Sequence, residues 1–173
     1  MDLPDETTGF ERVIIFDNAG IGRSWGEPAD SVKAMADDAA RFVRALGLDQ
    51  VDVLGWSLGG AVAQLLTLNH PGLVRRLEAA GSGPGGVPGS PAMPAEVWAV
   101  AGKPVNDDED LLYLFFPETP GGVAAGREHL ARLGRHTEGR GPMAGPEAVR
   151  AQATVIAAWG SGSGCTGGRG SSG

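Results

Sequence analysis

The chain has 173 residues, of which 42% are hydrophobic and 20% are charged, so we expect one globular domain rather than a disordered chain. A formal net charge of −7 and the lack of a basic patch exclude nucleic acid as a favoured partner. The single cysteine, Cys165, excludes an internal disulfide and favours the cytosol, and the acidic first ten residues do not resemble a signal peptide, so we expect a cytoplasmic protein.

The first predicted elements are a strand and a helix. Residues 12–16 (RVIIF) form a short run rich in β-branched residues before a turn-forming segment, which predicts a buried strand. The following segment predicts an amphipathic helix that Asp30 or Ser31 can cap and that Gly47 can close. Its apolar face comprises Val32, Met35, Ala36, Ala39, Phe42, Val43 and Leu46.

Two further strands and a helix follow at short intervals. Residues 51–55 predict a buried strand, residues 58–70 a helix that Pro71 ends, and residues 73–81 a third strand despite three charged residues. This alternating order with short links predicts an α/β fold with a parallel sheet and crossover helices. The uncharged stretch 53–74 is long enough to span a bilayer, but its glycines and polar residues argue against a membrane span.

The composition changes after Gly81. Residues 81–94 predict a loop, and four segments broken by proline and glycine then predict helices at residues 96–102, 108–116, 126–134 and 146–160. We therefore divide the chain into a core at residues 1–85, a helical cap at residues 86–159 and a disordered Gly/Ser-rich tail at residues 160–173.

A candidate catalytic motif joins the strand at residues 51–55 to the helix that follows it. Gly55-Trp56-Ser57-Leu58-Gly59 matches G-x-S-x-G, a weak pattern in a chain with 29 glycines. Its position between a strand and a helix is typical of a nucleophile elbow, in which the serine occupies a strained turn. We expect Gly55 and Gly59 to permit close backbone contacts and the Leu58 N–H to donate to an oxyanion. A plain glycine-rich turn is the alternative interpretation.

Residues 13–26 (VIIFDNAGIGRSWG) and 51–77 (VDVLGWSLGGAVAQLLTLNHPGLVRRL) together resemble the α/β-hydrolase superfamily, in its esterase and haloperoxidase-like branch. Asp17, Gly20, Gly22 and Ser24 match its D-x-x-G-x-G-x-S segment. The resemblance implies a serine hydrolase that cleaves a carboxylic ester or related acyl bond of a small molecule through Ser57, without a cofactor. It also implies that Asp17 is a structural turn residue.

A dinucleotide-binding site is a weaker interpretation of the same glycines. Gly20 and Gly22 follow a predicted strand, but Trp25 occupies the place of the third glycine in G-x-G-x-x-G. Asp37 and Asp38, at about the right separation, lie within a predicted helix rather than at the end of a second strand. We therefore reject this interpretation.

The partners that Ser57 needs are not identifiable in the sequence. A serine nucleophile requires a histidine base and a carboxylate that orients it, and this family places both after the serine. His70 ends the helix that begins beside Ser57, and we expect His129 and His136 to lie on the surface. No apolar strand follows Gly81, so we identify neither a catalytic acid nor a catalytic histidine.

The resemblance therefore predicts an incomplete α/β-hydrolase fold, consisting of central parallel strands, crossover helices and a helical cap. We expect a truncated or frame-shifted gene product, with little or no activity alone. The strands at residues 12–16 and 51–55 would lack the strand between them, and their edges would be unpaired. Two alternatives stay open: a non-catalytic binding module, or one half of a split hydrolase.

Overall fold

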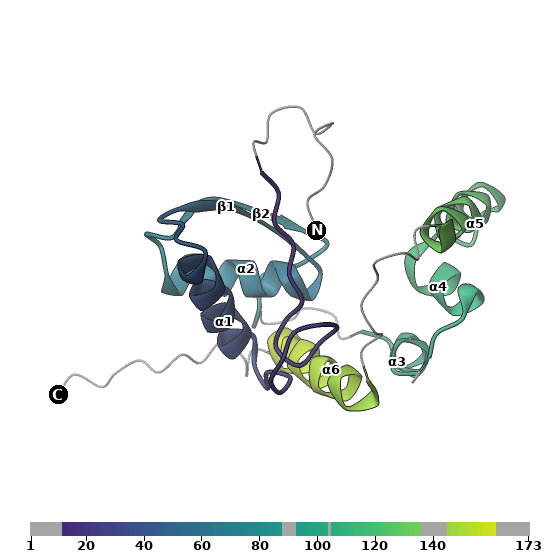
Figure 1. Cartoon of the computed structure of the whole chain (residues 1–173). Helices are drawn as coiled ribbons and strands as arrows, with labels where there is room; N and C mark the ends of the chain where they lie inside the picture. Colours follow the sequence, from purple (N-terminus) through teal and green to yellow (C-terminus); the bar gives the residue numbers. More distant parts are fainter. Residues whose placement is uncertain (1–11, 88–92, 104, 136–144, 162–173) are drawn as a thin grey trace.

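The computed structural model describes residues 12–87, 93–103, 105–135 and 145–161 (Figure 1). The described elements follow one another in this order: α1 (Val32–Ala45), β1 (Val51–Trp56), α2 (Leu58–Asn69), β2 (Val74–Ala80), α3 (Ala95–Ala101), α4 (Asp108–Phe115), α5 (Pro120–Arg135) and α6 (Pro146–Ser161). The predicted α/β order is confirmed for β1, α2 and β2, and the four predicted later helices are all present.

The sheet of the described region has two parallel strands, β1 and β2, which α2 connects. Their register runs from Val51 opposite Val74 to Trp56 opposite Ala80, with one irregularity between Val51 and Asp52. In Figure 1, α2 lies beneath this sheet and α1 lies beside α2. The opposite edge of β1 carries no strand within the described residues.

The strand predicted at residues 12–16 is wrong, because these residues are described and have no regular secondary structure. The segment is held instead by its last side chain, since the rings of Phe16 and Phe42 stack with centroids 4.4 Å apart. An extended segment is stable as a strand only when a neighbour satisfies its backbone N–H and C=O groups. Among the described residues no strand pairs with this segment, and an apolar pattern alone does not supply a pairing partner.

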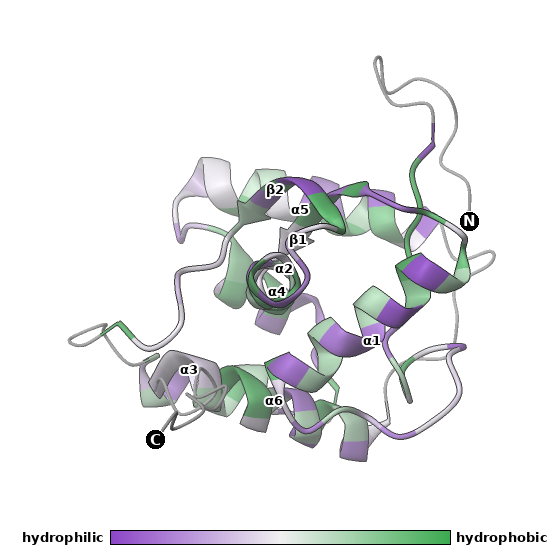
Figure 2. Cartoon of the chain, turned by 90° about the vertical axis from the view of Figure 1, so that its left-hand side faces the viewer, coloured by the Kyte–Doolittle hydropathy of each residue, from purple (hydrophilic) through white to green (hydrophobic). Residues whose placement is uncertain are grey.

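Helix α1 has the ends that its sequence predicts. Ser31, rather than Asp30, is the N-cap, and its hydroxyl accepts a hydrogen bond from the Ala34 N–H at 3.2 Å. Gly47 adopts a φ of +71°, and its N–H donates to the Arg44 carbonyl at 2.9 Å. Hydrophilic and hydrophobic residues both occur along the helix (Figure 2), as an amphipathic helix requires.

The hydrophobic core lies where α1 and α2 meet the start of β2. Its buried members are Val32, Met35, Ala36, Ala39, Ala40, Val43, Ala61, Val62, Leu66, Leu73, Val74 and Val155. Of the predicted face of α1, Phe42 is half-buried and Leu46 is exposed. Val155 comes from α6, and Trp159 of the same helix packs against this cluster.

Helices α3, α4 and α5 follow one another in space, and α4 and α5 lie side by side (Figure 1). Asp107 and Asp110 form a capping box at the start of α4, and the Lys103 ammonium donates to Asp110 at 2.5 Å. This hydrogen bond is the main cause that lowers the pKa of Asp110. Helix α5 begins at Pro120, six residues earlier than predicted, because the Thr119 hydroxyl accepts from the Gly122 N–H at 3.1 Å.

The predicted division into core, cap and tail stays a prediction. The predicted tail lies outside the described residues from residue 162 onward, as does His136. Within the part of the chain that the structure describes, no helix combines the length and the apolar character needed to cross a membrane.

Candidate active site

Ser57 lies in a sharp turn between β1 and α2. Its backbone has a φ of 54° and a ψ of −120°, and it is the one non-glycine residue of the described region with a positive φ. The Ser57 N–H donates to the Ala80 carbonyl of β2 at 2.9 Å, and its own carbonyl accepts from the Gly60 N–H at 2.9 Å. These two bonds hold a conformation that ordinarily costs a side-chain-bearing residue about 1–3 kcal/mol.

The side chain of Ser57 is free for chemistry. Ser57 is exposed, and although it occupies the N-cap position of α2, its hydroxyl makes no capping hydrogen bond. Serine at this position ordinarily bonds to a backbone N–H of the first turn. The turn therefore presents the hydroxyl without engaging it in the helix.

Gly55 and Gly60 are the glycines around the turn whose backbones lie closest to neighbouring atoms. A Cβ at Gly55 would overlap the carbonyl group of Gly59, and a Cβ at Gly60 would lie 2.5 Å from the Cβ of Ser82. A Cβ at Gly59 would meet no atom within 4 Å. Gly55 therefore permits a close backbone contact, as expected. The second position that has no room for a Cβ is Gly60 rather than Gly59.

Leu58 is the first residue of α2 and is half-buried. The N–H groups in the first turn of an α-helix have no acceptor within that helix, and they form the positive end of its dipole. The Leu58 N–H, directly after Ser57, can therefore donate to an oxygen that gains negative charge near the Ser57 hydroxyl.

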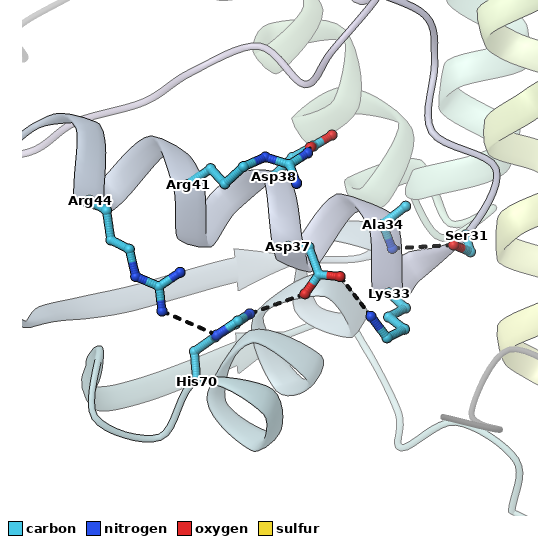
Figure 3. A network of polar contacts seen from close by, with 8 residues as sticks. All are labelled: Ser31, Lys33, Ala34, Asp37, Asp38, Arg41, Arg44 and His70. Atoms are coloured by element: carbon cyan, nitrogen blue, oxygen red, sulfur yellow. Dashed lines mark hydrogen bonds and ion pairs between the residues drawn. The ribbon is translucent and has the colours of Figure 1, made fainter. Parts of the chain in front are cut away.

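His70 is the C-cap of α2, as predicted, and lies at the opposite end of that helix from Ser57. The 12 residues of α2 hold the two roughly 18 Å apart. Figure 3 shows its contacts: Nε2 lies 3.1 Å from Oδ1 of Asp37, and Nδ1 lies 3.3 Å from Nη2 of Arg44. His70 therefore joins α2 to α1 and is not placed to accept a proton from Ser57.

Asp37 sits at the centre of this network. Lys33 donates to its Oδ2 at 2.7 Å, and this hydrogen bond, followed by the one from His70, lowers the pKa of the Asp37 carboxyl against the opposing effect of burial. A shallow depression of about 300 Å³ beside the network is lined by Arg44, Asp49, Asn69, His70, Pro71, Gly72 and Leu73. It lies at the far end of α2 and is separate from the elbow.

The other candidate residues have structural surroundings. His129 of α5 is exposed, and its ring centroid lies 5.9 Å from that of Phe116. Asp17 accepts the Arg23 N–H at 3.0 Å, and its carbonyl accepts the Ser24 hydroxyl at 2.6 Å, which is the arrangement of a turn residue. Within the described ranges, no hydrogen bond links Ser57 to a histidine or a carboxylate, and no group of three or more His, Cys, Asp and Glu side chains could hold a metal ion.

An aromatic contact at the elbow was not predicted from the sequence. The rings of Trp56 and Phe115 lie with centroids 6.1 Å apart and planes inclined by 43°, which brings the end of α4 to the end of β1. This pairing joins residues far apart in the chain, and the sequence carries no local signal for it. Phe115 is the last residue of α4 and contacts Trp56, whereas Phe116 is the C-cap, has an extended backbone and packs against Gly126 of α5.

Comparison with known proteins gives three findings. A sequence profile described as the alpha/beta hydrolase fold matches residues 7–159. RutD of Serratia proteamaculans (strain 568), provisionally named a carbamate hydrolase, is 40% identical over 68 residues, which are 38% of this chain and 26% of that protein. A 2-hydroxymuconate semialdehyde hydrolase of Pseudomonas putida is 42% identical over 74 residues, which are 41% of this chain and 26% of that protein.

A solved structure matches over a longer region. The α/β-hydrolase fold protein from Chitinophaga pinensis is 35% identical, with a TM-score of 0.76, over 86% of this chain and 54% of that one. The chain thus spans about a quarter of the two relatives and about half of this structure. The parallel β1–α2–β2 unit and a profile match over most of the length confirm the predicted fold. This chain belongs to the α/β-hydrolase fold family.

Proposed function

We propose that Ser57 is the nucleophile of a hydrolase that cleaves a carboxylic ester or a related acyl bond in a small molecule. The observation that carries this proposal is the backbone of Ser57, which has a positive φ at the junction of β1 and α2. Strain of this kind persists only where the surrounding structure imposes it, and it is concentrated at functional sites. Membership of a hydrolase family and the names of the two relatives support the same conclusion.

The proposed reaction has two steps. The Ser57 Oγ forms a bond to the carbonyl carbon while the hydroxyl proton passes to a base, and the carbonyl oxygen, which gains negative charge, accepts a hydrogen bond from the Leu58 N–H. The bond to the leaving alkoxide breaks, the alkoxide takes up the proton from the base, and the acyl group stays on Oγ as an ester. Water then attacks this ester, which releases the acid and restores the Ser57 hydroxyl.

We expect the removal of the proton from the Ser57 hydroxyl to limit the rate of the first step. A positioned general base contributes typically 10²–10⁴-fold, roughly, to such a step. The described residues place no histidine at Ser57, so we propose that the isolated chain reacts slowly and that a base supplied from solution accelerates it. Imidazole has the chemistry of the histidine side chain and is small enough to approach an exposed hydroxyl.

The test is covalent labelling of the isolated chain by a fluorophosphonate, with the modified residue identified by peptide mass spectrometry. Labelling forms a bond between Oγ and phosphorus, while fluoride leaves and the hydroxyl proton passes to the base. We expect little labelling in plain buffer and labelling of Ser57 that rises with imidazole concentration. Ser57→Ala should abolish it, and Ser24→Ala, which removes a hydroxyl already bonded to the Asp17 carbonyl, should leave it unchanged.

Two results would contradict the proposal in different ways. Imidazole-dependent labelling that spreads over several serines, or that survives in Ser57→Ala, would refute the assignment of Ser57. Rapid labelling of Ser57 without imidazole would leave the assignment intact but would show that the chain supplies its own base.

A further inference from the structure

We propose that Gln64 of α2 and Trp159 of α6 are positioning residues for Ser57, because both bind one backbone carbonyl in a loop that holds the turn at Ser57. This inference rests on the proposed function of Ser57 and adds to it the residues that maintain the geometry of that site. The loop comprises residues 81–87 and directly follows β2.

The side-chain amide of Gln64 joins the first turn of α2 to this loop. Its Nε2 donates to the Gly60 carbonyl at 3.1 Å and to the Gly83 carbonyl at 3.3 Å. An amide nitrogen carries two hydrogens, so both have an acceptor here. The Gly60 N–H in turn donates to the Ser57 carbonyl at 2.9 Å. Gln64 therefore ties the loop to the helical turn that fixes the backbone of Ser57.

Trp159 binds the same loop from α6 at two points. Its Nε1 donates to the Gly83 carbonyl at 3.4 Å, and its own carbonyl accepts the Gly86 N–H at 3.2 Å. The Gly83 carbonyl thus accepts from two side chains, one for each of its lone pairs. Helix α6 is anchored, because Val155 is buried in the hydrophobic core and Trp159 packs against that core. The loop is therefore attached to a helix that the core holds in place.

The loop and the end of β2 contact the turn directly. Ala80, the last residue of β2, accepts the Ser57 N–H at 2.9 Å through its carbonyl. Ser82 lies so close to α2 that a Cβ at Gly60 would be 2.5 Å from the Cβ of Ser82. A shift of the loop therefore disturbs both contacts. Because a strained backbone persists only where its surroundings impose it, loosening the loop lets Ser57 relax and moves its hydroxyl.

The test replaces each side chain by one that cannot donate. Gln64→Met has a similar length and no N–H, and Trp159→Phe keeps an aromatic ring and loses the indole N–H. At a fixed imidazole concentration we expect the fluorophosphonate to label Ser57 roughly tenfold more slowly in each variant, since a misplacement of about 1 Å can cost up to about 10²-fold. Thr67→Val is the matched control: it removes a hydroxyl that donates only within α2, to the Ala63 carbonyl at 2.8 Å, and should label at the parent rate.

A second measurement reports the turn without any reaction at Ser57. Amide hydrogen exchange, followed by NMR, compares the Ser57 N–H with the Val51 N–H, which donates to the Leu73 carbonyl at 2.9 Å at the opposite end of the sheet. We expect the ratio of the Ser57 rate to the Val51 rate to rise about fivefold in Gln64→Met and in Trp159→Phe, as the loss of one hydrogen bond gives. General destabilisation speeds both amides and leaves the ratio unchanged.

The outcomes separate the positioning role from the proposed function. Failure of all labelling in the parent chain, together with a raised exchange ratio in the two variants, would refute the nucleophile and leave the control of the turn intact. A labelling rate or an exchange ratio that a variant leaves unchanged, with its fold verified by circular dichroism, would overturn the role of the residue that it replaces. Equal slowing of labelling in Thr67→Val would overturn the role of Gln64, because any polar loss on α2 would then suffice.

Discussion

The strain at Ser57 predicts that removing its side chain stabilises the chain. The φ of 54° and ψ of −120° lie in a region that glycine occupies freely and that a residue with a Cβ enters at a cost of about 1–3 kcal/mol. Ser57→Gly relieves this cost. Glycine also makes the unfolded chain more flexible, which offsets about 0.4–1 kcal/mol of the gain.

The net expectation is that Ser57→Gly raises the free energy of unfolding by about 0.5–2 kcal/mol. For a chain of this length each kcal/mol corresponds to about 2–4 °C in Tm. Ser57→Ala is the matched control, because it keeps the Cβ and removes only the hydroxyl. Since that hydroxyl makes no capping bond, we expect Ser57→Ala to stay within about 0.5 kcal/mol of the parent chain.

The assay is urea unfolding followed by circular dichroism, with thermal unfolding as a second probe. The comparison that matters is Ser57→Gly against Ser57→Ala, because both lack the hydroxyl and differ only in the Cβ. Equal stability of the two variants, or a less stable glycine variant, would refute the view that the elbow is strained. Loss of stability in Ser57→Ala alone would show instead that the hydroxyl caps α2.

Two further predictions concern packing and pH. Gly60→Ala should destabilise the chain by about 1–3 kcal/mol, because the new Cβ would collide with Ser82. Gly59→Ala places its Cβ in open space, so it should be neutral or stabilise α2 by up to about 1 kcal/mol. Equal changes in the free energy of unfolding of the two variants, measured with urea, would contradict this prediction. The lowered pKa of Asp37 stabilises the fold at pH values above the ordinary pKa of 3.8, and this stabilisation is lost as the pH falls through the lower folded value. The difference in unfolding free energy between pH 7 and pH 3 should therefore be smaller in Asp37→Asn than in the parent chain, and Asp49→Asn, which removes an equal charge outside the network, should behave as the parent does.

Local signals in the sequence were sufficient for most elements of the fold. The cap at Ser31, the left-handed Gly47 and the apolar face of α1 are properties of neighbouring residues, and they locate that helix within a residue or two. Residues 12–16 have an equally clear apolar pattern but form no strand. A strand depends on a partner elsewhere in the chain, and a local pattern does not contain that partner.

At the elbow, too, local sequence patterns predict the turn but not the contacts with distant residues. The five-residue motif and its flanking strand and helix predicted a turn at Ser57, and the turn is there. The motif predicted the second close contact at Gly59, but the turn that follows β2 brings Ser82 against Gly60. The approach of Phe115 to Trp56 depends on how α4 packs on α5, which no motif describes.

The open edge of β1 makes the two-stranded sheet a template for other molecules. No described strand pairs with the outer N–H and C=O groups of residues 51–56, and the exposed Leu54 adds an apolar contact on a face of the same strand. Native proteins protect such edges with charged side chains, above all lysine. We therefore expect the chain to associate through this edge at high concentration, and we expect the gatekeeper substitution Leu54→Lys to reduce that association, as measured by light scattering.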